Sequence, residues 1–136
     1  MTMPRDVKAA NQALIEQFRS LGGAPEGRAL LLLTTTGRKT GQPYTTPMMF
    51  IPDGDRILVV ASNAGAPAHP DWYRNLVADP NVTVEVTGDT YQATAVPLRG
   101  EERDRTFAWI SERYTFFADH QAQVSRTIPV VALLRA

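Results

Sequence analysis

The amino-acid sequence predicts a mainly β domain with helices, of the α+β class, in which about six mostly antiparallel strands form a small barrel or sandwich. Two patterns lead to this prediction. Short runs rich in β-branched and apolar residues lie between tight turn signals, and a few other segments space their apolar residues as helices do. The chain has 136 residues, which fit a single domain spanning residues 1–136, without an internal repeat or a linker.

Four segments show helical signals. Residues 6–21 carry apolar side chains at helical spacing, and the two glycines that follow end the helix. Residues 70–78 begin with a proline, which is favoured at the first helical position. A third helix is predicted from Gly100 to residue 114, and residues 116–124 are predicted to add further helical turns.

The strands are predicted at residues 29–36, 44–51, 56–62, 82–86, 90–98 and 128–134. The first two flank a glycine-rich turn and therefore form a hairpin. Residues 56–62 are largely apolar, as in a buried barrel wall, whereas residues 82–86 alternate valine with polar residues, as in a half-buried strand.

Composition argues against several classes of function. The 14 basic and 14 acidic residues cancel, which disfavours broad nucleic-acid binding. The absence of cysteine removes disulfides, thiol nucleophiles, iron–sulfur clusters and thiolate zinc sites, and two distant histidines predict no metal site. The N-terminus lacks the apolar core of a signal peptide, and no apolar run approaches the roughly 18 residues of a membrane span. A cytoplasmic protein is therefore expected.

The first candidate site is the turn of the predicted hairpin, within residues 34–43. Gly37 and Gly41 permit unusual backbone angles there, and Arg38 and Lys39 bring two adjacent cations. Backbone amides, hydroxyls and cations together suit a phosphate or a carboxylate. The turn is not a Walker loop, because a strand follows it instead of a helix. A solvated basic hairpin explains the same residues, and both interpretations stay open.

The second candidate is the small-residue segment at residues 61–67. It follows a predicted buried strand and contains only small residues around Ser62 and Asn63, so another molecule can approach its backbone closely. This suits a flat ring bound by main-chain hydrogen bonds. A plain connection from strand to helix is the alternative.

The third candidate is the helix start at residues 69–76. Trp72 and Tyr73 are suited to wall a ring site, and Asn75 is suited to hydrogen-bond the edge of a heterocycle. Alternatively, Trp72 and Leu76 simply cap the barrel. A triad of Ser62, His69 and Asp71 is disfavoured, because no nucleophile-elbow pattern accompanies these residues.

The fourth candidate is the aromatic cluster at residues 113–120. It is suited to line an apolar substrate pocket, with Tyr114 as a hydrogen-bond donor or acid. Core packing is the alternative.

Taken in order, these segments resemble the deazaflavin-dependent nitroreductase family, the A group of the flavin/deazaflavin oxidoreductases. The matching pieces are LLLLTTTGRKTGQP at residues 30–43, TP at 46–47, DGD at 53–55, VASNAGAP at 60–67, HPDWYRNLVADP at 69–80 and RTIPVV at 126–131. The likeness runs from about residue 10 to residue 134, and its specificity lies in the combination.

The resemblance implies a split β-barrel related to flavin-binding pyridoxamine oxidases. It also implies a reductase that passes a hydride from reduced coenzyme F420, a deazaflavin, to quinones or other electron-poor ring compounds. Such a protein acts on a small-molecule substrate, without nucleic acid, as a monomer or a homodimer. A lipid-quinone substrate would suit a loose, peripheral association with the inner membrane.

The resemblance further implies two sets of site residues. The cofactor's phosphate and glutamyl tail fall on the Gly-Arg-Lys turn, and its ring falls on the segments after residues 60 and 70. The implied cofactor residues are Arg38, Lys39, Thr40, Gln42, Tyr44, Thr46, Pro47, Ala61, Ser62, Asn63, Ala66, Trp72, Tyr73 and Asn75. The substrate is expected against Phe18, Tyr114 and Phe117, with Ser62 and Tyr114 as catalytic residues that stabilise the developing oxygen charge or supply the proton.

Three positions depart from the pattern of the resemblance. Tyr44 stands where many relatives carry a basic residue, and Phe117 and His120 replace tyrosines of the nitroimidazole-reducing relatives. Activity on nitroimidazoles is therefore not carried over. The same barrel is also suited to bind flavin mononucleotide (FMN) or haem, or to act as a non-catalytic carrier of deazaflavin or lipid.

Overall fold

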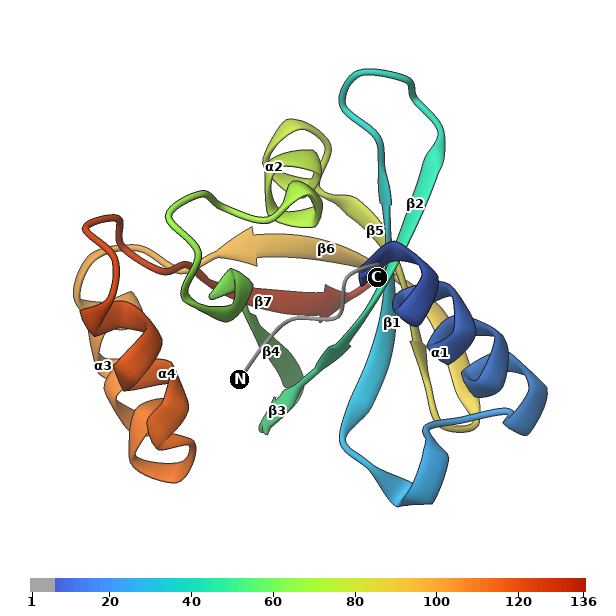
Figure 1. Ribbon diagram of the computed structural model, residues 1–136, viewed down its shortest axis with the longest axis horizontal. Helices are drawn as coiled ribbons and strands as arrows, with labels where there is room; N and C mark the ends of the chain where they lie inside the picture. Colours follow the sequence, from blue (N-terminus) through green and yellow to red (C-terminus); the bar gives the residue numbers. More distant parts are fainter. Residues whose placement is uncertain (1–6) are drawn as a thin grey trace.

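The computed structural model describes residues 7–136, which form a curled seven-stranded antiparallel sheet flanked by four helices (Figure 1). The helices are α1 (Val7–Leu21), α2 (Asp71–Ala78), α3 (Gly100–Arg113) and α4 (Thr115–Ala122). The strands are β1 (Leu30–Thr36), β2 (Pro43–Met49), β3 (Ile51–Asp53), β4 (Arg56–Val60), β5 (Asn81–Val86), β6 (Asp89–Pro97) and β7 (Val130–Arg135). Two short 3₁₀ turns are η1 (Pro25–Gly27) and η2 (Asn63–Gly65). The predicted α+β class is confirmed, and the predicted start of the first helix at Asp6 lies outside the described residues.

The sheet curls into a barrel because the two ends of its strand order are consecutive in the chain. The order is β2-β1-β5-β6-β7-β4-β3, and only Phe50 separates β2 from β3. Met49 still pairs with Leu30 of β1, whereas Ile51 already pairs with Leu58 of β4. The prediction of one strand over residues 44–51 is therefore wrong, since the chain bends at Phe50 to pair with a different neighbour on each side.

The barrel interior is built from alternating residues of its strands, as the period of a strand requires. The predicted alternation of β5 places Val82 and Val84 inside, and β6 adds Ala93 and Ala95. Trp72 and Leu76 of α2 cover one end of this interior, as the barrel-cap interpretation predicts. Leu31, Leu33, Val59, Ala61, Val131 and Leu133 complete it.

Two smaller apolar clusters cover the outer faces of the sheet. Ile15 and Phe18 of α1 pack on Leu30 and Leu32 of β1. On the opposite side of the molecule (Figure 1), α3 and α4 pack on β4 and β7. Within the described residues, no helix is long and apolar enough to cross a membrane.

Two strand ends differ from the prediction for local reasons. The last strand begins at Val130 and not at 128, because the amide of Ile128 donates to the Gln121 side chain and Pro129 has no N–H to offer a ladder. β4 ends at Val60, where the chain enters the η2 turn.

Candidate functional site

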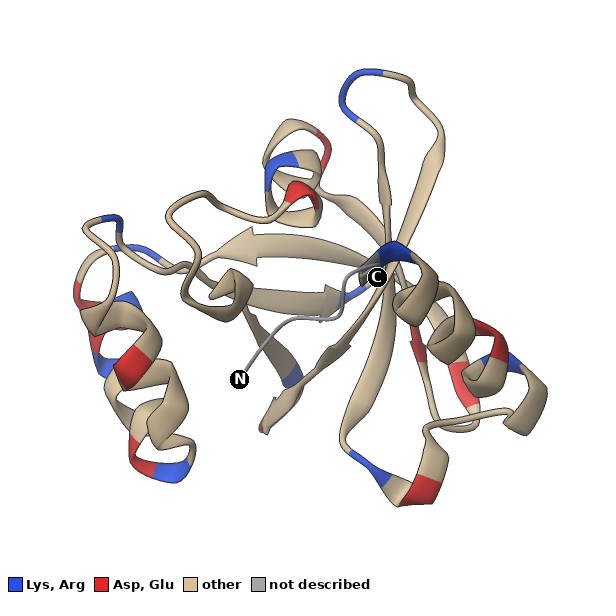
Figure 2. Cartoon of the chain, viewed as in Figure 1, with Lys and Arg blue, Asp and Glu red and all other residues tan. Residues whose placement is uncertain are grey.

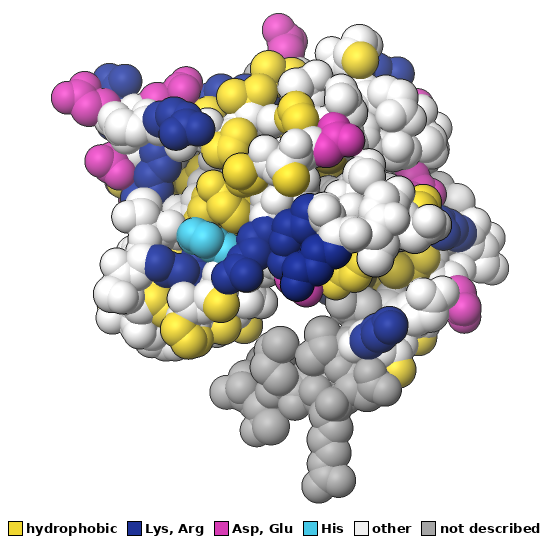
Figure 3. Space-filling model, turned by 90° about the horizontal axis from the view of Figure 1, so that it is seen from above, with side chains coloured by type: hydrophobic (Ala, Val, Ile, Leu, Met, Phe, Trp, Pro, Cys, Tyr) yellow, Lys and Arg dark blue, Asp and Glu magenta, His cyan; other side chains and the backbone are white. Residues whose placement is uncertain are grey.

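A continuous groove runs between the β1–β2 hairpin tip, α2 and α1. Three adjoining cavities of about 380, 650 and 260 Å³ form it, and all three are lined by Tyr44 and Asp71. The first cavity lies at the hairpin tip, the second between α1 and β2, and the third beside the segment that follows β4. Seen from this end of the molecule, Lys and Arg side chains gather next to a histidine (Figure 3).

The hairpin tip is shaped by residues that are close in sequence. The amide of Gly37 donates to the Gln42 carbonyl at 2.8 Å, and the amide of Gly41 donates to the Gly37 carbonyl at 2.8 Å. A Cβ on residue 37 would lie 2.9 Å from the Thr40 hydroxyl, and Gly41 has a φ of 71°. Both glycines are therefore needed for the turn. Figure 2 shows its two cations at the outermost point of the hairpin.

Asn75 holds Arg38 in place at the edge of the groove. The Asn75 side chain is 3% exposed, and its Oδ1 accepts from the backbone amide of Arg38 at 3.2 Å and from the guanidinium at 2.9 Å. Its Nδ2 donates to the Thr35 hydroxyl at 3.2 Å. Asn75, predicted to contact a ring, is thus largely engaged with the chain itself. Arg38 also pairs with Asp71 at 3.2 Å, whereas Lys39 makes no ion pair with any described residue.

Two hydroxyls lie on segments that border the groove, and that of Thr46 lines one of its cavities. Ser62 is 8% exposed, and its hydroxyl makes no hydrogen bond with another described residue. The Thr46 hydroxyl on β2 is buried without a partner among the described residues, and Thr46 lines the 260 Å³ cavity together with Asn63. Ala61 is fully buried, so only its backbone can contribute to a site.

The two aromatic residues at the start of α2 have different environments. Trp72 is buried in the barrel interior and also lines the 260 Å³ cavity, so it caps the barrel and borders the groove. Tyr73 is partly buried, with its ring 4.8 Å from that of His69. Pro47 lies in β2 opposite Leu32, and Ala66 lies at the end of the segment after β4.

The three predicted substrate residues do not come together. Phe18 is buried against β1, while Tyr114 and Phe117 belong to the cluster of α3 and α4 on the other side of the sheet. Tyr114 precedes α4, whereas His120, near the other end of that helix, packs against Gly65 of η2. An eight-residue helix spans roughly 12 Å, so Tyr114 is well separated from the Ser62 segment.

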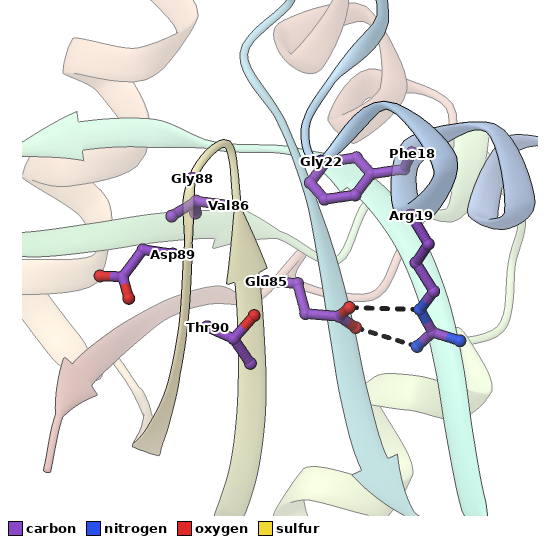
Figure 4. Close-up of a pocket in the computed structure, with 8 residues that line it drawn as sticks. All are labelled: Phe18, Arg19, Gly22, Glu85, Val86, Gly88, Asp89 and Thr90. Carbon is purple, nitrogen blue, oxygen red and sulfur yellow. Dashed lines mark hydrogen bonds and ion pairs between the residues drawn. The ribbon is translucent and has the colours of Figure 1, made fainter.

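A separate cavity of about 420 Å³ lies at the C-terminal end of α1 (Figure 4). Its lining includes Phe18, Arg19 and Glu85. Arg19 donates two hydrogen bonds to the Glu85 carboxylate, at 3.2 and 2.9 Å, and this contact raises the pKa of Arg19. Because each charge neutralises the other, this cavity offers little to a charged ligand, and Phe18 is its only predicted site residue.

Sequence reasoning missed the role of Arg126. This residue precedes β7, and its guanidinium contacts the segment after β4 and the His69 ring. The two chain segments meet because β4 and β7 are antiparallel neighbours, which brings the end of one beside the start of the other. Arg126 belongs to the RTIPVV piece of the resemblance, but no local pattern signals a contact so distant in sequence.

Comparison with known proteins gives the same family from sequence and from structure. The family model described as F420H(2)-dependent quinone reductase matches residues 8–135. An F420H(2)-dependent quinone reductase of Mycobacterium tuberculosis is 43% identical over 119 residues, which cover 83% of this chain and 76% of that protein. A solved structure described as an F420-H2 dependent reductase is 36% identical, with a TM-score of 0.70 over 78% of this chain and 94% of that one.

Two further solved structures bear on assembly and fold. One, described as a domain-swapped dimer, is 34% identical with a TM-score of 0.73, over 93% of this chain and 96% of that one. A pyridoxamine 5'-phosphate oxidase-like protein of Listeria innocua is 16% identical with a TM-score of 0.57, over 88% and 91% of the two chains, which supports the fold alone. The predicted split β-barrel is confirmed.

Proposed function

The chain belongs to the F420H(2)-dependent quinone reductase family, and from this premise we propose that it passes a hydride from reduced coenzyme F420 to a quinone or another electron-poor ring compound. The observation that supports this most directly is the groove beside the hairpin tip. Arg38, Lys39 and Thr40 line its outer end, where cations and a hydroxyl suit a phosphate and carboxylates. Gln42 and Tyr44 line the same cavity and extend this set.

The residues at the inner end of the groove fit a heterocyclic ring with polar edges. The Thr46 hydroxyl is buried and without a partner among the residues described, a condition that costs free energy unless a ligand or water satisfies it. Trp72 adds an aromatic wall. The Ser62 hydroxyl, on the residue before Asn63 of this cavity, also has no hydrogen-bond partner among the described residues. Asn63 lines this cavity, with Tyr73, Asn75 and Pro47 as supporting residues. Ala61 and Ala66 stay predictions as cofactor contacts, because their amides and carbonyls already bond within the chain.

When bound, reduced F420 supplies a hydride, and a quinone that takes up this hydride and one proton becomes a quinol. The chain's own task is to orient both rings, exclude water and stabilise the oxygen on which negative charge develops. We assign the stabilising hydrogen bond to the Ser62 hydroxyl, which is buried and free to donate. Tyr114 stays a prediction as proton donor, since it lies at the far end of α4, and Phe117 stays a prediction as a substrate contact.

The 650 Å³ cavity between α1 and β2 is the proposed entrance for the acceptor. It shares Asn11, Tyr44 and Asp71 with the cavity that contains Thr46 and Trp72. Ile15 adds apolar surface from α1, which agrees with the expectation that the substrate lies against the first helix. A cytoplasmic location and a loose membrane association stay predictions, which cell fractionation tests. Sedimentation distinguishes a monomer from a homodimer.

The proposed function is tested by titrating the purified protein with oxidised F420 and following its fluorescence. The reduced cofactor is then mixed with menadione, and the return of its visible absorption is timed. We expect binding, and reoxidation faster than without protein. Binding without faster reoxidation would favour a carrier of deazaflavin. If F420 does not bind, the proposed function is wrong, and FMN and haem become the ligands to test.

A Ser62→Ala variant tests the catalytic assignment. Loss of one donor to a developing oxyanion typically lowers turnover by about 100-fold. We expect that loss with nearly unchanged F420 affinity. Ser111→Ala is the matched control, because the Ser111 hydroxyl is also buried without a described partner but belongs to α3, away from the groove. Equal activity of the Ser62 variant and the control would contradict the role of Ser62.

A further inference from the structure

One guanidinium binds three carbonyls of the segment after β4, whose Asn63 lines the groove. Arg126 donates from Nε to the Ala66 carbonyl at 3.1 Å, and from its two terminal nitrogens to the Ala61 carbonyl at 3.2 Å and the Ser62 carbonyl at 2.8 Å. All three acceptors belong to residues 61–66, which we call the β4 loop. An arginine suits this task because its five donors are rigidly spaced.

The β4 loop has a conformation that needs support. Asn63 and Ala64 have φ values of 51° and 54°, and Gly65 follows at 79°. The left-handed region is accessible to glycine, but it costs about 1–2 kcal/mol for a residue such as alanine. Two amide-to-carbonyl bonds within the loop, from Gly65 to Ser62 and from Ala66 to Asn63, form only in this bent shape. Arg126 stabilises that shape by binding carbonyls at both ends of the loop.

The same guanidinium determines which nitrogen of His69 carries the proton. An N–H of Arg126 lies 2.9 Å from His69 Nδ1, and arginine has no acceptor, so Nδ1 must be the unprotonated nitrogen. A neutral ring then carries its hydrogen on Nε2. Burial lowers the pKa of His69, and the charges of Arg126 and Arg74 lower it further. The contact with Arg126 and the lowered pKa both favour the neutral form. His69 lines the 260 Å³ cavity, beside Thr46 and Trp72.

We propose that Arg126 is a positioning residue for the ring end of the groove, which shapes the β4 loop and presents His69 as a neutral ring with its hydrogen on Nε2. Arg126 acts through Ser62, Ala66 and His69 and does not line the groove cavities itself. The link to cofactor binding rests on the proposed function, whereas the state of His69 can be measured without any cofactor.

Arg126→Met is the central variant, because methionine keeps an apolar stem and removes every donor. We expect the dissociation constant for oxidised F420 to rise about tenfold, equivalent to about 1.4 kcal/mol. We also expect nitrogen NMR of the ligand-free protein to lose the single Nε2–H form of His69, because Nδ1 loses its donor. Arg126→Lys restores the positive charge without the several donors of a guanidinium. It should recover only part of the F420 affinity and only part of the Nε2–H form of His69.

Arg56→Met is the matched control. Arg56 is likewise partly buried and binds the carboxylates of Asp53 and Glu102, which lie away from the β4 loop and from the segment of Arg126. We expect it to lower the melting temperature while leaving F420 affinity and the His69 spectrum unchanged. If Arg126→Met does not fold, the comparison is made with Arg126→Lys alone.

The two proposals fail in different ways. Wild-type affinity and an unchanged His69 spectrum in both Arg126 variants would overturn the positioning role while leaving the proposed function intact. If the wild-type protein does not bind F420, the proposed function fails, and the His69 spectrum still decides the role of Arg126. If Arg56→Met weakened F420 binding and changed the His69 spectrum as much as Arg126→Met, both effects would come from general destabilisation, and the positioning role would be overturned.

Discussion

The hairpin tip at residues 37–42 and the β4 loop at residues 61–66 both leave barrel strands and border the same groove, yet different interactions shape them. The tip is closed by its own backbone, through bonds among Gly37, Gly41 and Gln42. The β4 loop depends on Arg126, which lies 60 or more residues further along the chain. A turn closed by its own backbone hydrogen bonds leaves its side chains available to a ligand. In a loop fixed by a distant side chain, the conformation of the backbone depends on that contact.

The chemistry of the two regions differs accordingly. The tip offers charge: Arg38 is oriented by Asn75, and Lys39 is free of ion pairs with the described residues. The β4 loop offers the Ser62 hydroxyl and small side chains beside a buried tryptophan. Charge at one end, and at the other a wall that combines Trp72 with polar side chains, suit a ligand with an acidic tail and a flat ring with polar edges.

The largest expected effect on cofactor affinity comes from removing the charge of the tip. Arg38→Ala combined with Lys39→Ala should raise the dissociation constant for oxidised F420 at least tenfold, or about 1.4 kcal/mol. The effect should shrink at high salt, because exposed charges are screened. Fluorescence titration measures it. Arg99→Ala with Arg105→Ala removes the same charge from exposed positions at and near the start of α3 and should change little. Equal weakening by both pairs would mean that the tip is not the anion site.

Relief of strain in the β4 loop is expected to have the next largest effect, on stability. Ala64→Gly should raise the free energy of unfolding by about 0.5–1 kcal/mol, because the left-handed φ costs alanine more than glycine loses in entropy. Ala108→Gly, in the exposed middle of α3, should lower it by about 0.5–1 kcal/mol. Urea unfolding compares them. A loss of stability in both variants would show that the loop is not strained.

A smaller effect is expected from the one carboxylate that lines all three cavities of the groove. Asp71→Asn should tighten F420 binding about threefold, because it removes a negative charge that competes for Arg38, while Asn75 still orients that side chain. The effect is limited because the Asp71 side chain is 64% exposed. Asp104→Asn is the control, since Asp104 pairs with Arg103 outside the groove. Weaker binding in the Asp71 variant would show that the carboxylate supports the site.

The smallest effect is expected from pH, acting on the β4 loop through His69. Because the folded-state pKa of His69 is lowered, the unfolded chain takes up the proton first as the pH falls below about 6.5. The contribution of neutral His69 to the free energy of unfolding is therefore fully present above that pH and is lost as the pH falls below it. His69→Asn, which keeps an acceptor for Arg126, should show a shallower loss between about pH 7 and pH 5. If the free energy of unfolding fell equally with pH in the wild type and in His69→Asn, His69 would have the same pKa in the folded and the unfolded chain.

Much of the fold follows from local pattern. The period-two alternation of β5 correctly predicts Val84 in the interior, and the proline before α2 marks a helix start to within one residue. The break at Phe50 has no local signal, because it arises from the exchange of one pairing partner for another. The sequence suggests two alternative roles for Trp72, and the structure supports both. It packs with Leu76 in the barrel interior, and the tertiary fold also brings it to the groove.

By itself the sequence determined most of the strands, the glycine turn with its two cations and, through the resemblance, the family. These depend on residues that are close in the chain. Tertiary structure alone decided that Asn75 orients Arg38, that Phe18 lies apart from Tyr114, and that Arg126 binds the β4 loop. The physical reason is that antiparallel pairing and helix packing join residues tens of positions apart, and their hydrogen bonds leave no periodic trace in the sequence.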